Sequence, residues 1–137
     1  MSLSQSIYAR VTSDSPLTAL IGTRITPGEP IQGDGYPYVV YNVIDKDPTV
    51  HLTGDNLEDR TLVQFDIVSD DYDEVRDTVR ALRVRLGGWS ATGEGDRTIK
   101  GAHLTGERDQ HERAKDGSDA LLYRSSVDFA IWAEDTA

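Results

Sequence analysis

The sequence of 137 residues contains no cysteine. This absence excludes disulfides, thiolate metal sites and cysteine nucleophiles together. No apolar run approaches the ~20 residues that a transmembrane helix needs. The N-terminus also lacks the basic stretch followed by an apolar stretch that is typical of a signal peptide. We therefore expect the chain to fold in the cytoplasm where it is made, with no membrane partner.

Positive charge is scarce, because 14 Lys and Arg face 24 Asp and Glu and leave a formal net charge of −10. A surface this negative repels phosphate, so specific binding of nucleic acid is not expected. DNA could still pass close to the protein without being held. The simplest explanation of the acidity is solubility.

One stretch, Thr61–Trp89, predicts a strand, a tight acidic turn and a helix. Apolar residues alternate with other residues over Thr61–Val68, as in a strand with one buried face. After the turn, apolar residues recur at spacings of three and four, which places them on one side of a helix: Tyr72, Val75, Val79, Leu82 and Leu86. Asp71 and Glu74 have the spacing of a capping box, and Gly87-Gly88 predicts a left-handed stop.

The remaining segments complete a single domain over residues 1–137. Ser2–Ile21 predicts one interrupted helical arm, in which Ser15 caps a second turn that begins with Pro16. The further predictions are a short extended piece at Arg24–Thr26, a strand at Tyr36–Lys46, a polar loop at Asp47–Asp59, an extended stretch at Thr98–Glu112 and a strand at Leu121–Trp132. This order predicts an α+β fold, a mostly antiparallel sheet of four to five strands with two helices on one face and a long C-terminal β-hairpin.

No residue pattern points to catalysis or to a bound cofactor. The glycine-rich loop before Tyr36 lacks a phosphate-binding motif and leads into a strand. His111 has acidic neighbours but no second histidine at metal-binding spacing, and Ser69–Asp73 lacks the glycine and the final glutamate of a calcium loop. No serine lies in a nucleophile elbow. We therefore expect no enzymatic activity, no metal and no cofactor.

Four passages together resemble the tail completion or tail terminator proteins of long-tailed phages and related tail-like particles. They are the helical opening LTALIGTRITPG, the strand YPYVVYNVI, the strand and helix TLVQFDIVSDDYDEVRDTVRALRVRL, and the hairpin that runs from ERDQHE to LLYRSSVDFAIW. The passages cover nearly the whole chain and occur in the order that the family shows. The resemblance carries no partner-contact residues onto Thr49–Glu58 or Ser90–Arg97.

The resemblance implies a structural virion protein without catalytic residues. Such a protein forms a ring, commonly of six copies, that caps the completed tail tube and docks to the head. Its partners would be other copies of itself, the major tail tube protein and a head-side connector or stopper protein. Two alternatives stay open: a neck adaptor or minor tail protein of the same assembly, and an unrelated small cytosolic ligand-binding or enzymatic α+β domain.

The tip of the predicted C-terminal hairpin, Arg108–Asp119, is charged and almost free of apolar side chains. An isolated domain has little use for a long charged ribbon, whereas mixed charge can fix the register between neighbouring subunits. We therefore predict an interface at six of its residues: Arg108, Asp109, Glu112, Arg113, Lys115 and Asp116.

Overall fold

The computed structural model describes residues 3–28, 35–51, 54–92, 98–113 and 121–134. Side chains are described within these ranges except at 47–51, 54–59, 91–92, 98, 112–113 and 134. The helices are α1 (Leu3–Thr12), α2 (Ser15–Ile21) and α3 (Tyr72–Leu86). The strands are β1 (Ile25–Pro27), β2 (Tyr38–His51), β3 (Gly54–Ser69), β4 (Ala91–Thr92), β5 (Thr98–Arg113) and β6 (Leu121–Glu134).

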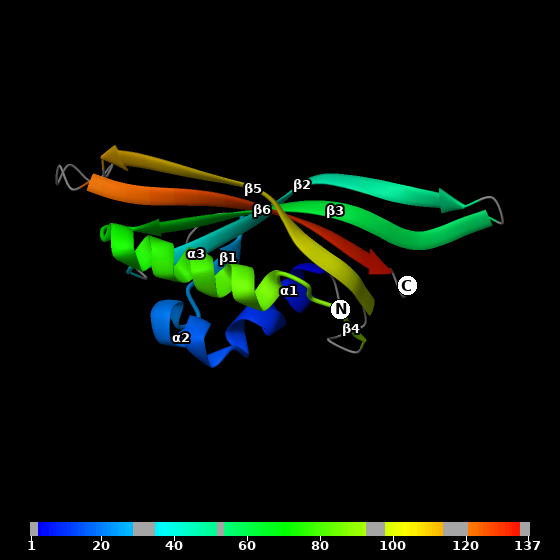
Figure 1. The fold of residues 1–137 in the computed structure, drawn as a ribbon, viewed down its shortest axis with the longest axis horizontal. Coiled ribbons are helices and arrows are strands. Elements are labelled where there is room, and N and C mark those ends of the chain that lie inside the picture. The colour runs from blue at the N-terminus through cyan, green and yellow to red at the C-terminus, as the bar shows by residue number, and fades with distance from the viewer. Residues whose placement is uncertain (1–2, 29–34, 52–53, 93–97, 114–120, 135–137) are drawn as a thin grey trace.

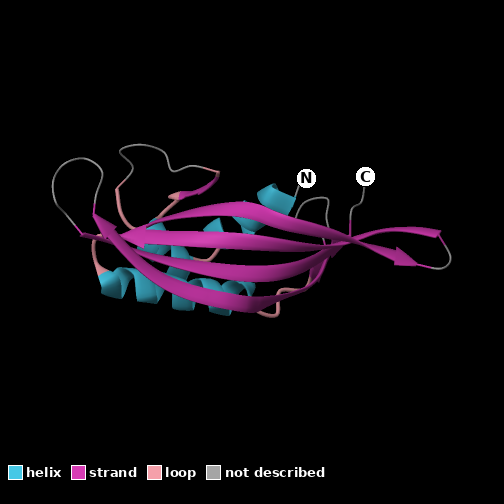
Figure 2. Ribbon diagram, turned by 90° about the horizontal axis from the view of Figure 1, so that it is seen from above, coloured by secondary structure: helices cyan, strands magenta, loops and turns pink. Residues whose placement is uncertain are grey.

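The six described strands form one sheet in the order β1-β2-β3-β6-β5-β4. All neighbouring strands pair antiparallel except β1 and β2, which pair in parallel over three residues. The three helices cover one side of this sheet (Figure 1), and the four long strands lie side by side in front of them in Figure 2. The α+β fold and the C-terminal hairpin are confirmed. The sheet has one strand more than predicted, and the interrupted arm is two separate helices.

The core lies between the helices and the facing side of the sheet. The period-two pattern of the strands places Val63, Phe65 and Ile67 there with no exposed surface. Phe65 meets Tyr41 and Phe129 at centroid distances of 5.8 Å. Burying each such side chain stabilises the fold by ~1.5–3 kcal/mol. Trp89, which follows α3, is 1% exposed and belongs to the same core.

The first turn of α3 is capped, but not by the predicted capping box. The Asp71 carboxylate accepts a hydrogen bond from the amide of Asp73 at 3.0 Å. Glu74 does not reach back to the backbone of Asp71, because its carboxylate accepts a hydrogen bond from the hydroxyl of Ser69 at 2.7 Å. The pairing of Asp71 with Glu74 is therefore wrong, although Asp71 is the N-cap.

At the end of α3, Gly87 and Gly88 have different roles. Gly88 is the left-handed residue, with φ 75°, whereas Gly87 is extended. A Cβ at Gly87 would lie 2.6 Å from the carbonyl oxygen of Arg83, too close for any other residue without a backbone shift. The left-handed residue of the predicted Gly87-Gly88 stop is therefore Gly88.

Asp14, not Ser15, is the N-cap of α2. The Asp14 carboxylate accepts a hydrogen bond from the amide of Leu17 at 3.4 Å, and Pro16 occupies the first turn. The predicted position of the cap was therefore wrong by one residue. A carboxylate suits this place because the first amides of a helix lack partners within the helix.

The predicted polar loop Asp47–Asp59 is also wrong, because most of it continues β2 and β3 into a long hairpin. The backbone pairing runs out to Val50 opposite Asp55 and His51 opposite Gly54. Register shifts occur between Val43 and Asp45 and again between Pro48 and Val50. This hairpin extends well beyond the helix layer at the right of Figure 1.

Candidate subunit interface

Of the six predicted interface residues, the structure describes the side chains of Arg108 and Asp109. Arg108 and Asp109 lie within β5 and are paired in register with Ser126 and Ser125 of β6. Since neighbouring residues of a strand point to opposite faces, Arg108 lies on the sheet face without helices and Asp109 on the helix side. The backbones of Glu112 and Arg113 end β5. Their side chains, like Lys115 and Asp116, lie outside the described part of the chain, so an interface role for these four stays a prediction.

Arg108 joins a polar network on the helix-free face of the sheet. Its guanidinium donates to the Asp128 carboxylate at 3.0 Å and to the Gln64 side chain at 3.4 Å. Gln64 donates in turn to Asp66 at 3.1 Å, and the Ser126 hydroxyl donates to the same Asp66 oxygen at 2.6 Å. The Asp128 side chain is only 14% exposed, so this ion pair shields a carboxylate that is largely removed from water.

Asp109 belongs to a second network, beneath the start of α3. Its carboxylate accepts hydrogen bonds from the Tyr72 phenol at 3.1 Å, from Arg76 at 3.3 Å and from the Ser125 hydroxyl at 2.9 Å. Arg76 also pairs with Glu107 at 3.1 Å. The hydrogen bond to Asp109 raises the pKa of Tyr72 above its ordinary value, because ionising the phenol would remove its proton and place two negative charges together. The first network joins three strands of one chain, and the second joins strands to α3 within the same chain.

Tyr72 is therefore not a core residue of α3, contrary to the prediction from its spacing. The residue is 43% exposed, and its ring lies edge-to-face with the ring of Tyr123 at a centroid distance of 5.6 Å. The other four members of the predicted apolar side of α3 are buried: Val75, Val79, Leu82 and Leu86.

Two exposed apolar patches lie apart from the predicted interface residues. On α3, Val84 is 78% exposed, and on β2, Val43 and Ile44 are 55% and 48% exposed. Val43 and Ile44 lie just past the end of β1, whose last residue, Pro27, pairs with Tyr41. A sequence signal existed for Val84, because it is an apolar residue outside the buried side of a strongly amphipathic helix.

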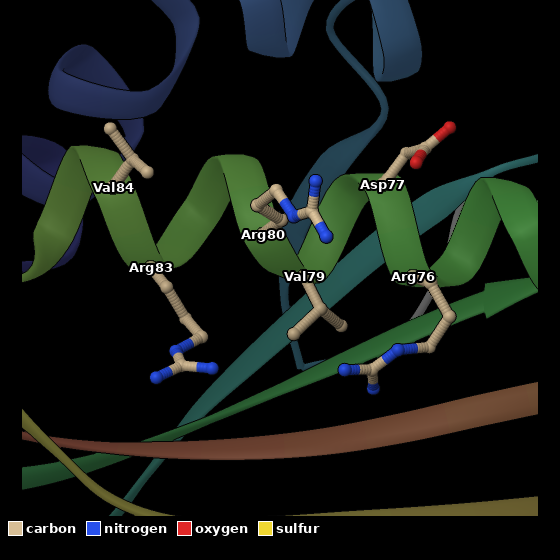
Figure 3. A pocket seen from close by; sticks show the side chains of 6 residues that line it. All are labelled: Arg76, Asp77, Val79, Arg80, Arg83 and Val84. Carbon is tan, nitrogen blue, oxygen red and sulfur yellow. The ribbon is translucent and has the colours of Figure 1, made fainter.

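Val84 lies where two grooves run along opposite sides of α3. The groove between α2 and α3, of about 490 Å³, has a mainly apolar lining: Asp14, Pro16, Ala19, Leu20, Asp77, Arg80, Ala81 and Val84. The other, of about 400 Å³, is more basic and includes Arg76, Arg80 and Arg83. In Figure 3, Arg76 and Arg83 point toward the sheet, whereas Val84 and Asp77 point to the opposite side of the helix. An apolar groove with charged edges suits contact with another protein.

The described residues contain no group of three or more His, Asp or Glu side chains that could hold a metal ion. Within the same residues, none of the helices is both long enough and apolar enough to cross a membrane. His111, which the sequence offered as a weak metal candidate, is exposed and pairs in register with Tyr123 on the C-terminal hairpin.

Comparison with known proteins gives a family and a fold. The family model described as tail completion protein gp17 matches residues 5–134. A solved structure with a similar fold is a chain of the virion of a native gene transfer agent particle. The two chains share 18% sequence identity with a TM-score of 0.68, over 97% of this chain and 95% of the other. No curated protein matches the sequence.

Proposed function

This chain belongs to the tail completion protein family, and from that premise we propose that it forms a ring, of six copies, that ends the tail tube and joins it to the head. Membership makes it a structural protein of the virion tail. The observation that carries the proposal is the extent of the family match, which runs from within α1 to the last residue of β6. We expect no enzymatic activity.

The shape and surface of the chain support a ring. A cyclic ring larger than a dimer needs two different patches on each subunit, so that one patch meets the other on the next copy. The chain has exposed apolar side chains on β2 and, separately, on α3. In addition, the β2–β3 hairpin extends beyond the helix layer, where it can contact a neighbour, the tube protein or a head-side connector (Figure 1).

Net charge supports the passage of DNA without binding. Six copies at −10 each would carry a formal charge of about −60. A charge of that size repels phosphate along the channel of a ring, and DNA could pass without being retained.

The proposal is tested by deleting the gene in the strain that produces the particle and supplying it again from a plasmid. We expect the deletion to give separate heads and tails in negative-stain images, and the plasmid to restore joined particles. Immunogold labelling should place the protein at the head-proximal end of the tail. Labelling elsewhere on the tail would favour a minor tail protein, and labelling on the head side of the joint a neck adaptor.

Copy number is a separate measurement. Native mass spectrometry of the protein released from purified tails should give a species near 91 kDa, six times the 15.1 kDa chain. A different uniform multiple would contradict six copies while leaving the ring in place. A species at the mass of a single chain would contradict the ring.

A further inference from the structure

The three most exposed large apolar side chains among the described residues are Val84, Val43 and Ile44. Single exposed apolar residues are common on protein surfaces and need no explanation. These differ because Val84 lines the apolar groove between α2 and α3, and because Val43 and Ile44 are adjacent at a register shift of β2. One patch therefore lines a groove, and the other is an exposed apolar pair on a strand.

The two patches also have opposite charge next to them. On α3, Arg76 is paired with Glu107 and Asp109, and Arg85 donates to the carbonyl oxygen of Arg10. Arg80 and Arg83, by contrast, have no acidic partner among the described side chains. On β2, the exposed Asp45 directly follows Ile44. From Asp45 to Asp59 the sequence carries five acids and one lysine.

We propose that the groove between α2 and α3 binds the Val43–Asp45 segment of a second copy of this chain. In this contact Ile44 packs against Val84 and the apolar lining of the groove, and Asp45 pairs with Arg80 or Arg83. The inference rests on the proposed ring and identifies which surfaces join its subunits. Because the two surfaces are different parts of the chain, the contact is heterologous and repeats from copy to copy.

The segment is accessible to a neighbour. β1 pairs with β2 only from Val39 to Tyr41, so the β2 edge that follows has no strand beside it among the described residues. Direct edge-to-edge pairing of subunits is a weaker explanation, because register shifts and charged residues interrupt both β2 and β5. Packing of the side chains into a groove needs no regular edge.

The absence of cysteine allows a direct test by disulfide cross-linking. The double variant Ile44→Cys with Val84→Cys is produced in place of the natural chain, and purified particles are oxidised and run on a non-reducing gel. Both positions are exposed, so we expect the variant to fold, which circular dichroism checks. We expect a ladder of covalent oligomers. Each single variant serves as a control and should remain monomeric, because a heterologous contact brings residue 44 only to residue 84.

The outcomes separate this inference from the proposed function. A ladder from the double variant alone supports the docking. Joined particles that contain the protein at the tail end but give only monomers would overturn the docking and leave the ring intact. Particles that assemble without the protein at the tail end would overturn the proposed function itself.

A charge exchange gives an independent readout. Arg80→Glu with Arg83→Glu should reduce the titre of joined particles at least tenfold without changing the melting temperature of the purified chain. Adding Asp45→Lys should restore part of the titre. Asp70→Lys is the matched control, because Asp70 is an exposed acid before α3 and should restore nothing. If Asp45→Lys and Asp70→Lys restored the titre equally, the proposed pairing of Asp45 with Arg80 or Arg83 would be contradicted.

Discussion

At the scale of single residues, the sequence predicts that Arg108 contacts a neighbouring subunit, whereas in the structure it forms an ion pair with Asp128 of its own chain. Taken alone, a charged residue on a predicted hairpin tip is free to contact a neighbouring subunit. In the structure, Arg108 is the cation beside Asp128, and one oxygen of that carboxylate is buried with no hydrogen-bond partner among the described residues. Charge reversal at Arg108 would therefore disturb the fold of the single chain, and a loss of assembly in that variant would not by itself show a subunit contact.

We expect Arg108→Glu to lower the melting temperature of the isolated chain. The new carboxylate would face Asp128 across neighbouring strands, where like charges are destabilising. Arg108→Gln keeps a hydrogen-bond donor and should change the free energy of unfolding by less than ~1 kcal/mol, as is usual for a half-exposed ion pair. Thermal melts followed by circular dichroism compare the two variants. A glutamate variant as stable as the natural chain would show that the pair with Asp128 contributes nothing.

The hydrogen bond from Tyr72 to Asp109 predicts a dependence on pH. The pKa of Tyr72 is raised above 10.0, first by this hydrogen bond. A raised folded-state pKa means that the bond stabilises the fold below about pH 10, and that this contribution is lost as the pH rises through the folded-state pKa. Ultraviolet titration near 295 nm, with Tyr72→Phe to identify the signal, should show the Tyr72 pKa falling toward 10 in Asp109→Asn. An unchanged pKa in that variant would contradict the assigned cause.

Two valines of α3 form a matched pair for a test of burial. Val79 has no exposed surface, whereas Val84 is 78% exposed. We expect Val79→Asp to unfold the domain, because an unpaired buried carboxylate destabilises by several kcal/mol, comparable with the stability of a whole domain. Val84→Asp should melt within a few degrees of the natural chain. A cooperative melt of Val79→Asp near the natural temperature would contradict the packing of α3.

At the scale of elements, the periodicity of apolar residues predicts the strands and helices that have a buried side. It does not predict elements that are exposed on all sides. The strand Thr61–Val68 and the helix after it are predictable because their buried side chains repeat at periods of two and of three to four. The outer half of the β2–β3 hairpin has no such repeat. Pro48 and Gly54 favour a loop locally, and only the pairing of the two strands with each other makes the segment extended.

The caps show the same limit over a single turn. Asp14 and Ser15 are both good N-cap residues, so the sequence alone does not choose between them. We expect Asp14→Ala to reduce the free energy of unfolding by ~1 kcal/mol, the usual effect of removing an N-cap. Ser15→Ala should have a much smaller effect, because Ser15 lies inside the helix. Urea unfolding measures the free energy of unfolding of both variants. An equal decrease in the two would contradict Asp14 as the N-cap.

The candidate interface was less predictable than the fold. Arg108 and Asp109 were predicted interface residues because they are charged. Charge alone does not distinguish an ion pair within one chain from a contact with a neighbouring subunit. Val43 and Ile44 lie in a strand with apolar residues on both faces, a pattern that indicates either cover on both sides or an interface and does not choose between them. The exposure of Val43 and Ile44 follows from where β1 ends, which no local pattern encodes, whereas Val84 lies off the apolar side of α3, which the sequence does show.

At the scale of the whole molecule, charge is unevenly distributed. On the helix-free face, three described acids (Asp45, Asp66 and Asp128) face three arginines (Arg60, Arg108 and Arg124), so this face is balanced. Exposed acids gather instead around the start of α3, at Asp70, Asp71 and Asp73. The repulsion of DNA by a ring would therefore depend on which parts of the chain line its channel.

We expect the purified protein to show no retention of double-stranded DNA in a filter-binding assay at about 50 mM salt, where electrostatic binding is strong. The reason is the net charge of −10, which opposes contact with phosphate. The variant carrying Asp70→Lys, Asp71→Lys and Asp73→Lys provides a comparison, because it reduces the net negative charge around the start of α3. Saturable binding by the natural protein would contradict free passage of DNA.

The position of β6 has a consequence for how the chain is made. This strand comes last of the six along the chain, yet it lies in the middle of the sheet between β3 and β5. While a ribosome is still synthesising the first 120 residues, β3 has no partner on that edge, and Phe65 lacks the ring of Phe129 against which it packs. The domain therefore cannot fold progressively from its N-terminus, and a nascent chain that stops before Leu121 would leave an unpaired apolar strand open to aggregation.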